Sequence, residues 1–305
     1  MIDILFFYFL LASLFVFGKK VGMYFSPFQL TAARLLIMGV IFLSYSLLMG
    51  QVKLKQVLKH KFIFFGFIIS ALCADLFRFM SLTVLPASHS ALISTTSPFI
   101  AAILSYLVFK EYISWQKACA LALGAIGIMP LMYNNMVALP VSTTHILIKG
   151  YGSALISTIA FITNGLCIKK LGMYGYKLLA ILGVSLTIAG FMTGCIGLCI
   201  QPHFFDAYFS YFDSLPLVIL PSLVAYPLYG YLVCAYPLTL VAFAQLSSPI
   251  WAALILWHNG HNELSLPFIF SFCLLTIAFA LFYHHERKDK KNMQQHQAQQ
   301  QVADK

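Results

Sequence analysis

Apolar runs of about 20 residues recur along the chain, and they constrain its fold more than any other feature. A helix needs about 20 such residues to cross the hydrocarbon core of a bilayer. Of the 305 residues 61% are hydrophobic and only 9% are charged, whereas a soluble domain carries about 25% charged residues. So little charge cannot cover a water-exposed surface. The sequence therefore predicts an all-α integral membrane protein.

Ten segments are long and apolar enough to be predicted as transmembrane helices. Their connections are short, which is typical of a compact helix bundle. The Gln-rich stretch QQHQAQQQVADK after the last segment has no apolar face to bury and is predicted to be disordered. The ten predicted segments are 2–18, 26–49, 62–84, 87–109, 116–134, 147–168, 176–200, 214–235, 238–258 and 266–284.

Basic residues are unevenly distributed between the two sets of loops. With a cytoplasmic N-terminus, fourteen Lys and Arg residues fall on the cytoplasmic side and three on the opposite side. Because basic residues accumulate in cytoplasmic loops, both termini are predicted to be cytoplasmic. This placement in short loops and in the tail HHERKDKK also argues against nucleic-acid binding, despite a net charge of +10.

A sequence repeat divides the chain into two halves. KKVGMY at 19–24 recurs as KKLGMY at 169–174, and TTSPFIAAIL at 95–104 recurs as LSSPIWAALI at 246–255. Since each half holds five predicted spans, an odd number, the halves must cross the membrane in opposite directions, as in many secondary transporters. A duplicated scaffold without a transport role is the alternative. The expected organisation is two inverted five-helix repeats at 1–134 and 147–284, a linker at 135–146 and a cytoplasmic tail at 285–305.

Two stretches give the chain a family resemblance. GKKVGMYFSPFQLTAARLL lies early in the first half, and ALISTTSPFIAAILSYLVFKEYISWQ closes its fourth span. With ten spans in two halves, this pattern resembles the EamA-type transporters of the drug/metabolite transporter superfamily. The resemblance implies a multi-pass protein of a bacterial inner membrane that moves amino acids, related amphipathic metabolites, nucleotide-derived compounds or toxic organic compounds. Members in intracellular bacteria import S-adenosylmethionine, often in exchange for its spent product.

The leading functional hypothesis is a secondary-active transporter that works by alternating access, driven by a coupling proton or by a counter-substrate. A drug or metabolite exporter is the alternative within this class, and a membrane-embedded enzyme is the competing class. The sequence has no nucleotide-binding GxxxxGK[ST] motif, no HExxH motif and no nucleophile elbow. We therefore expect a small-molecule substrate, no cofactor and no enzymatic activity, in a monomer or homodimer within the bilayer.

Ionisable side chains inside a predicted span are costly to bury, and they mark functional positions. Asp75 and Arg78 share one helix face in the third span and can pair directly. They line a substrate cavity or form an internal ion pair. Because little other positive charge falls near this position, the sequence favours a cationic, ring-bearing ligand.

Polar residues and prolines mark the fourth and ninth spans. A hydroxyl stripe that includes Ser94 and Thr95 precedes Pro98, and Gln245 and Trp251 flank Pro249. A proline removes a backbone donor, so these hydroxyls either satisfy freed carbonyls or bind substrate. Interrupted helices near the midplane are typical of substrate sites in inverted-repeat transporters. We predict that Pro98 and Pro249 mark helix breaks with a role in gating.

Aromatic and amide side chains complete the predicted site. Tyr226 and Tyr229 share a face of the eighth span, where they form a wall for a flat ligand or pack as apolar rings. Asn164 in the sixth span is expected to bond across helices or to contact substrate. Cys195 and Cys199 share a helix face but lack a third ligand, so they are interpreted as small buried apolar residues, and no metal site is predicted.

Overall fold

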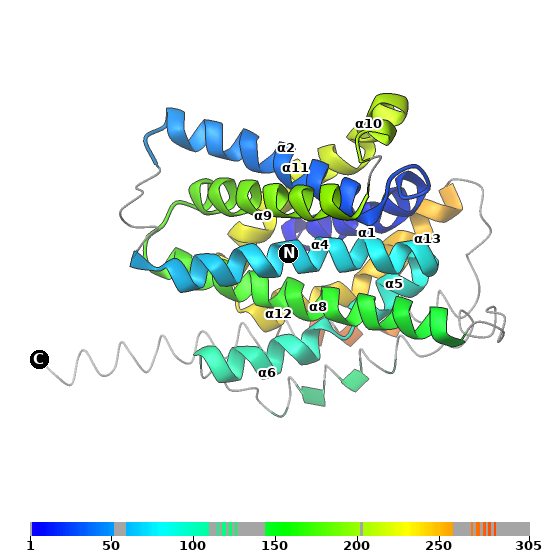
Figure 1. The fold of residues 1–305 in the computed structure, drawn as a ribbon. Helices are drawn as coiled ribbons and strands as arrows, with labels where there is room; N and C mark the ends of the chain where they lie inside the picture. Colours follow the sequence, from blue (N-terminus) through cyan, green and yellow to red (C-terminus); the bar gives the residue numbers. More distant parts are fainter. Residues whose placement is uncertain are drawn as a thin grey trace, which may run out of the picture.

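The computed structural model describes residues 2–51, 59–109, 144–201 and 204–258, with a few isolated residues in 115–126 and 270–284. The regular structure of this part of the chain is helical (Figure 1). Its α-helices are α1 (Ile2–Val21), α2 (Pro27–Leu48), α4 (Lys61–Val84), α5 (Ala87–Ser94), α6 (Ser97–Phe109), α8 (Thr144–Met173), α9 (Leu178–Ile200), α10 (Asp206–Tyr211), α11 (Pro216–Ala235), α12 (Leu238–Phe243) and α13 (Ser248–His258). Two 3-10 helices, η2 (Phe212–Ser214) and η3 (Ala244–Ser247), complete the set.

Seven of the described segments are long and apolar enough to cross a membrane, so the chain is a multi-pass integral membrane protein. They comprise α1, α2, α4, α9, α11, most of α8 and the continuous stretch Leu238–His258. The predicted span 87–109 is instead two shorter helices, α5 and α6, separated by a turn. The predicted spans 116–134 and 266–284 lie almost wholly outside the described residues.

Local sequence signals explain where several helices begin. At α2 the Gln29 backbone N–H donates to Ser26 Oγ over 3.3 Å, and the Ser26 N–H donates to Gln29 Oε1 over 2.8 Å. This capping box satisfies two amides that would otherwise lack partners. Pro27 occupies the first turn, where a missing N–H costs little. Pro98 and Pro249 take the same early place, each as the second residue of α6 and α13.

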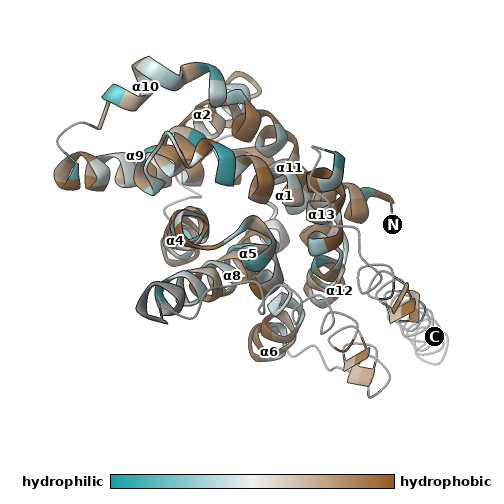
Figure 2. Ribbon diagram, turned by 90° about the vertical axis from the view of Figure 1, so that its right-hand side faces the viewer, coloured by the Kyte–Doolittle hydropathy of each residue, from teal (hydrophilic) through white to brown (hydrophobic). Residues whose placement is uncertain are grey.

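The helices pack as a bundle in which elements of the first half (α1–α6) alternate with elements of the second half (α8–α13). The helix α2 runs along α9, α4 runs along α8, and α1 packs against α11. Figure 2 looks along many of the helices and shows α1 close to α11 and α4 close to α8. Every one of these three contacts joins one half of the chain to the other.

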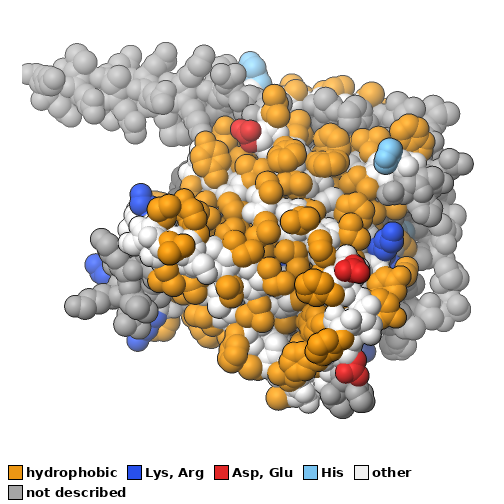
Figure 3. Space-filling model, turned by 90° about the horizontal axis from the view of Figure 1, so that it is seen from above, with side chains coloured by type: hydrophobic (Ala, Val, Ile, Leu, Met, Phe, Trp, Pro, Cys, Tyr) orange, Lys and Arg blue, Asp and Glu red, His pale blue; other side chains and the backbone are white. Residues whose placement is uncertain are grey.

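Two glycines allow the backbones of α2 and α9 to approach closely. A Cβ at Gly39 would collide with the backbone of Thr187, and a Cβ at Gly190 would collide with the backbone of Leu36. Any side chain at either glycine would therefore force the two helices apart. The outer face over α2 and α9 is mainly apolar, with few charged side chains (Figure 3), as expected for a surface that contacts lipid.

An aromatic pair joins the two halves at each end of the bundle. Tyr24, just after α1, stacks on Tyr211 of α10 with ring centroids 4.5 Å apart. Tyr174, just after α8, stacks on His60 with ring centroids 4.1 Å apart. The α10 end is further fixed because Gln29 Nε2 donates to the Phe204 carbonyl over 2.6 Å.

Candidate functional site

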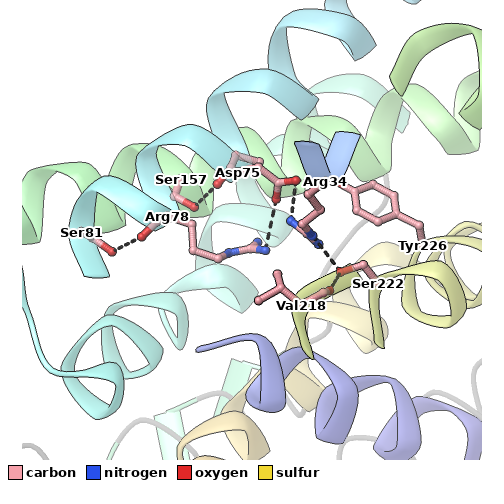
Figure 4. A network of polar contacts seen from close by, with 9 residues as sticks. Arg34, Asp75, Arg78, Ser81, Ser157, Val218, Ser222 and Tyr226 are labelled. Atoms are coloured by element: carbon pink, nitrogen blue, oxygen red, sulfur yellow. Dashed lines mark hydrogen bonds and ion pairs between the residues drawn. The ribbon is translucent and has the colours of Figure 1, made fainter. Parts of the chain in front are cut away.

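Three charged side chains meet in the interior of the bundle (Figure 4). Asp75 of α4 lies between Arg34 of α2 and Arg78 of α4, and all three are at most 5% exposed. Arg34 Nη1 is 2.5 Å from Asp75 Oδ2, and Arg78 Nη1 donates to Asp75 Oδ1 over 3.3 Å. We call this group the charged centre. A buried charge is tolerated when it is paired and hydrogen-bonded, and Asp75 provides the pairing for both guanidinium groups.

The second half of the chain supplies hydroxyl groups to the charged centre. Tyr226 Oη donates to Asp75 Oδ2 over 3.2 Å, and Arg34 Nε donates to Ser222 Oγ over 2.7 Å. The Arg34 guanidinium carbon also lies 5.4 Å from the centroid of the Tyr226 ring. Ser222 and Tyr226 both belong to α11, so this helix closes the centre from the side opposite α4.

Within the charged centre two guanidinium groups face one carboxylate, which leaves one positive charge in excess. The expectation that little positive charge lies near this position is therefore wrong, because Arg34 is brought there from α2. A ligand with an anionic group would neutralise the excess charge, whereas a purely cationic ligand would add to it. The charges of this centre thus favour a ligand that carries an anionic group.

The helix breaks lie next to each other, on the Arg78 side of the centre. The first break is the turn at Thr95 and Thr96 between α5 and α6, and the second is η3 between α12 and α13. Gln245 of η3 reaches across and donates from Nε2 to Ser94 Oγ over 2.9 Å. Ser94 is the last residue of α5, so this bond joins the two interrupted helices directly.

Two narrow cavities adjoin Arg78, each with about 280 Å³ of empty volume. The first, which we call the polar cavity, lies between the charged centre and the helix breaks. The second, the aromatic cavity, is lined by Arg34, Arg78, Tyr226, Tyr229 and Phe161 together with apolar residues of α1. A larger hollow of about 940 Å³ between α2, α9 and α10 is lined almost wholly by apolar side chains, so it has little to recognise a polar solute. The polar cavity is lined by Arg78, Ser90, Ser94, Ser157, Thr158 and Gln245, with Phe15, Phe161 and Ala154.

Most of the predicted site residues converge on these cavities. Tyr229 is 2% exposed, stacks on Phe161 with ring centroids 4.6 Å apart and donates to the Phe161 carbonyl over 3.3 Å. Thr95 is buried at the first helix break. Asp75, Arg78, Ser94, Tyr226 and Gln245 lie at the centre or the polar cavity, as described above.

Two predicted residues lie elsewhere. Trp251 packs against Ala12, Val16 and Phe9 of α1, where its ring centroid is 5.6 Å from that of Phe9. Asn164 is buried in α8 and lines neither cavity, and its Nδ2 has no hydrogen-bond partner among the described residues. The position of Trp251 or Asn164 in the sequence does not show towards which neighbouring helix its side chain points.

Several residues of the site were not predicted from the sequence. Arg34 is the most important, and its position inside a predicted span was the signal that could have identified it. Ser157 and Thr158 of α8 and Ser222 of α11 are ordinary hydroxyl residues within apolar runs, and nothing in their local sequence marks them. Phe161 is likewise one of many aromatic residues. Their contribution depends on helix packing.

Within the described residues, no group of three or more His, Cys, Asp or Glu side chains could hold a metal ion. Cys195 and Cys199 are exposed rather than buried, because their face of α9 points outward from the bundle. The interpretation of these two cysteines as buried residues was wrong. Their surroundings are apolar, and Cys195 lines the large hollow beside α10.

The sequence profile of the EamA-like transporter family matches residues 2–133. This match confirms the family resemblance for that part of the chain, which is less than half of its length. The matched family is one of transporters, not of enzymes.

Two bacterial relatives extend the similarity over most of the chain. The S-adenosylmethionine/S-adenosylhomocysteine transporter of Chlamydia muridarum (strain MoPn / Nigg) is 21% identical over 292 residues, which cover 91% of this chain and 89% of that protein. The transporter of the same name from Chlamydia trachomatis serovar L2 (strain ATCC VR-902B / DSM 19102 / 434/Bu) is 20% identical over 291 residues. These residues cover 91% of this chain and 87% of that transporter. The chain in one crystal structure is 16% identical to this chain, and the two superpose with a TM-score of 0.74. The aligned part covers 93% of this chain and 97% of the chain in the crystal structure, so the two share a fold.

Proposed function

Because residues 2–133 belong to the EamA-like transporter family, we propose that the chain is a secondary-active transporter that exchanges S-adenosylmethionine for S-adenosylhomocysteine. The observation that carries this proposal is a buried centre with excess positive charge, placed between the two halves of the bundle. Both compounds carry a carboxylate, which this centre can bind. The similarity to the two chlamydial transporters supports the same choice of cargo.

Residue pairs across the bundle support an inverted repeat. Gly39 approaches Thr187 and Gly190 approaches Leu36. Gly39 and Gly190 are 151 positions apart, as are Leu36 and Thr187, and this is the offset of the second sequence repeat. Gly39 follows Leu36 along α2, whereas its partner Thr187 precedes Gly190 along α9. The two helices therefore run antiparallel. Two equivalent contacts of this kind are expected from a two-fold axis in the membrane plane.

Two further contacts locate the axis. Ser94 bonds to Gln245, and Asp75 bonds to Tyr226, and each pair is separated by 151 residues. A residue can contact its own equivalent only at or near a two-fold axis. A two-fold axis between the halves would therefore pass close to both the charged centre and the helix breaks, where a substrate would be accessible from either side when the halves rock.

Alternating access would follow from movement of the two halves about this axis. The turn before Pro98 and the 3-10 helix before Pro249 interrupt the two helices that meet there, and short interruptions are places where a helix bends at low cost. Exchange of two metabolites needs no bound nucleotide. We place the protein in a bacterial inner membrane with both termini cytoplasmic, following the distribution of basic residues.

The proposal is tested by transport in vesicles that contain the purified full chain. Vesicles loaded with unlabelled S-adenosylhomocysteine should accumulate labelled S-adenosylmethionine, and vesicles loaded with buffer alone should accumulate much less. Protein-free vesicles are the control. Equal uptake with and without internal S-adenosylhomocysteine would contradict exchange, and absence of uptake in both cases would contradict the proposed cargo.

Orientation is tested separately by labelling single cysteines in a cysteine-free variant. Met23→Cys lies in an exposed turn after α1, and Lys59→Cys lies in an exposed position before α4. An impermeant thiol reagent applied to whole cells should label position 23 and should label position 59 only after lysis. Labelling of both from outside would contradict the topology.

A further inference from the structure

We propose that the polar cavity binds the α-amino acid head group of the substrate, with Arg78 holding the carboxylate and the Gln245 amide oxygen holding the ammonium group. This inference rests on the proposed transport function, and it specifies which end of the solute enters which cavity. It makes Arg78 and Gln245 the residues that determine specificity.

Arg78 has unused hydrogen-bonding capacity. A guanidinium group has five N–H donors, and among the described residues one of its nitrogens donates, to Asp75 over 3.3 Å. The rings of Phe15 and Phe161 have centroids 5.6 Å and 5.7 Å from the Arg78 guanidinium carbon. Such rings contact the flat faces of a guanidinium and keep water away, and they leave the edge of its plane for hydrogen bonds. A carboxylate fits this edge because it can accept two parallel N–H bonds.

Gln245 supplies the complementary acceptor. The Ser94 hydroxyl donates its hydrogen to the Ala91 carbonyl over 2.5 Å, so towards Gln245 it can only accept. The Gln245 amide must therefore present its nitrogen to Ser94, at 2.9 Å. This fixes the orientation of the amide and leaves Oε1 as the free atom. That oxygen is buried and has no hydrogen-bond partner among the described residues.

A buried acceptor without a partner costs free energy, so it favours a ligand that brings a donor. The hydroxyls of the polar cavity are already engaged: Ser157 donates to the Ala74 carbonyl, Thr158 to the Ala154 carbonyl, and Ser90 bonds to Ser81. Their oxygens can still accept further hydrogen bonds. The cavity thus combines one cation with several acceptors, and none of its described lining residues carries a carboxylate.

This combination matches an α-amino carboxylate and excludes simpler ligands. A carboxylate without an amino group would leave Gln245 Oε1 unpaired. An amine without a carboxylate would bring a second cation near Arg78 and no anion to pair with either charge. Arg78 and Phe161 line both cavities, so a head group held at Arg78 places the remainder of the solute towards the neighbouring aromatic cavity and Tyr229.

The test compares ligands that differ only in the head group, using thermal stabilisation of the purified full chain. The adenosyl series is S-adenosylmethionine, its decarboxylated form and 5′-methylthioadenosine, and the second series is L-methionine and 3-(methylthio)propylamine. We expect the two parent compounds to bind at least tenfold more tightly than the analogues without a carboxylate. A bound ligand raises the melting temperature by mass action, so the titration gives relative affinities.

A variant pair sharpens the assignment of Gln245. Gln245→Met keeps the length of the side chain and removes both the acceptor and the bond to Ser94. Because only the acceptor is proposed to contact the head group, the change should weaken S-adenosylmethionine binding at least tenfold while leaving 5′-methylthioadenosine binding unchanged, whereas a general disturbance of the helix break would weaken both. Ser247→Ala is the matched control in the same short helix, because within the described part of the chain Ser247 bonds to the Ala244 carbonyl alone and does not line the cavity. Equal weakening by both variants would overturn the role of Gln245.

The outcomes separate this inference from the proposed function. If the analogues without a carboxylate bind as tightly as their parents, the head-group site is overturned and the proposed cargo stands. If no adenosyl compound binds while L-methionine binds and its amine does not, the proposed cargo is overturned and the head-group site stands. If none of the five compounds binds, both are overturned. These comparisons use the wild-type chain, so they hold even where a variant fails to fold.

Discussion

The two halves of the molecule have equivalent helices but contribute different chemistry to the site. The first half supplies all the charge of the centre: Arg34, Asp75 and Arg78. In the second half, the positions 151 residues later are Ser185, Tyr226 and Tyr229. The close contacts between α2 and α9 involve one glycine from each half, Gly39 and Gly190. The two halves are thus alike where these backbones touch and differ in the side chains that they contribute to the charged centre.

This difference has a physical reason. A symmetric site would place two copies of each charge near the axis, and four guanidinium groups with two carboxylates would double the excess positive charge in a medium of low dielectric constant. Hydroxyl groups in the second half can bond to the charges of the first without adding to them. Ser222 and Tyr226 do this for Arg34 and Asp75.

The largest expected effect comes from the one carboxylate of the centre. Asp75→Asn leaves two buried guanidinium groups without an anion, so the free energy of unfolding should fall by about 3 to 5 kcal/mol and transport should be lost. Thermal denaturation in detergent and vesicle uptake measure the two effects. Asp3→Asn removes an exposed carboxylate at the start of α1 and should change neither. A stable and active Asp75→Asn protein would contradict the account of the charged centre.

The next effect tests the symmetry of the packing. Gly39→Val and Gly190→Val each force α2 away from α9, and each should lower the stability by about 1 to 3 kcal/mol, as overpacking does. Because the two contacts are equivalent, the two losses should be similar. The melting temperature of each variant is the measurement. Gly152→Val, at a position with no neighbouring atom near its Cβ, is the control. A large difference between the first two variants would argue against equivalent contacts.

A smaller effect separates the two tyrosines of α11. Tyr226→Phe removes a hydrogen bond to a carboxylate and should cost about 1.5 kcal/mol, whereas Tyr229→Phe removes a bond to a backbone carbonyl and should cost about 1 kcal/mol. Only Tyr226→Phe alters the charged centre, so it should reduce transport more than Tyr229→Phe does. Equal losses of transport in both variants would show that the Tyr226 hydroxyl has no special role.

The smallest effects are expected at the two ends of the bundle. Tyr24→Leu and Tyr174→Leu remove a stacked ring but keep apolar surface, and an aromatic pair contributes about 0.5 to 1.5 kcal/mol. The end near Tyr24 is also fixed by the bond from Gln29 to the Phe204 carbonyl. Loss of Tyr24 should therefore change the melting temperature less than loss of Tyr174 does. The reverse order would contradict this comparison of the ends.

The membrane class, the family and most of the spans could be predicted because each depends on composition or local pattern. The membrane helices could be predicted from the length of the apolar runs. Part of the site could be predicted because Asp75 and Arg78 are charged residues within a predicted span. Contacts between helices could not be predicted in the same way. Arg34 reaches Asp75 only because α2 and α4 are neighbours, and Trp251 points towards α1 although it follows Pro249 closely in sequence.

The break between α5 and α6 was also only partly predictable. Pro98 indicated an interruption of the span 87–109, and the interruption is the turn at Thr95 and Thr96, just before α6 begins. A proline restricts the residue before it, yet whether a helix bends or ends there depends on which groups satisfy the freed carbonyls.

The most direct test of the central claim is the position of a bound ligand, determined in a crystal structure of the full chain grown with S-adenosylhomocysteine. The account predicts that the ligand lies on the axis between the halves, with its carboxylate within hydrogen-bonding distance of Arg78. A ligand bound elsewhere, such as in the apolar hollow between α2, α9 and α10, with the charged centre unchanged, would contradict the account.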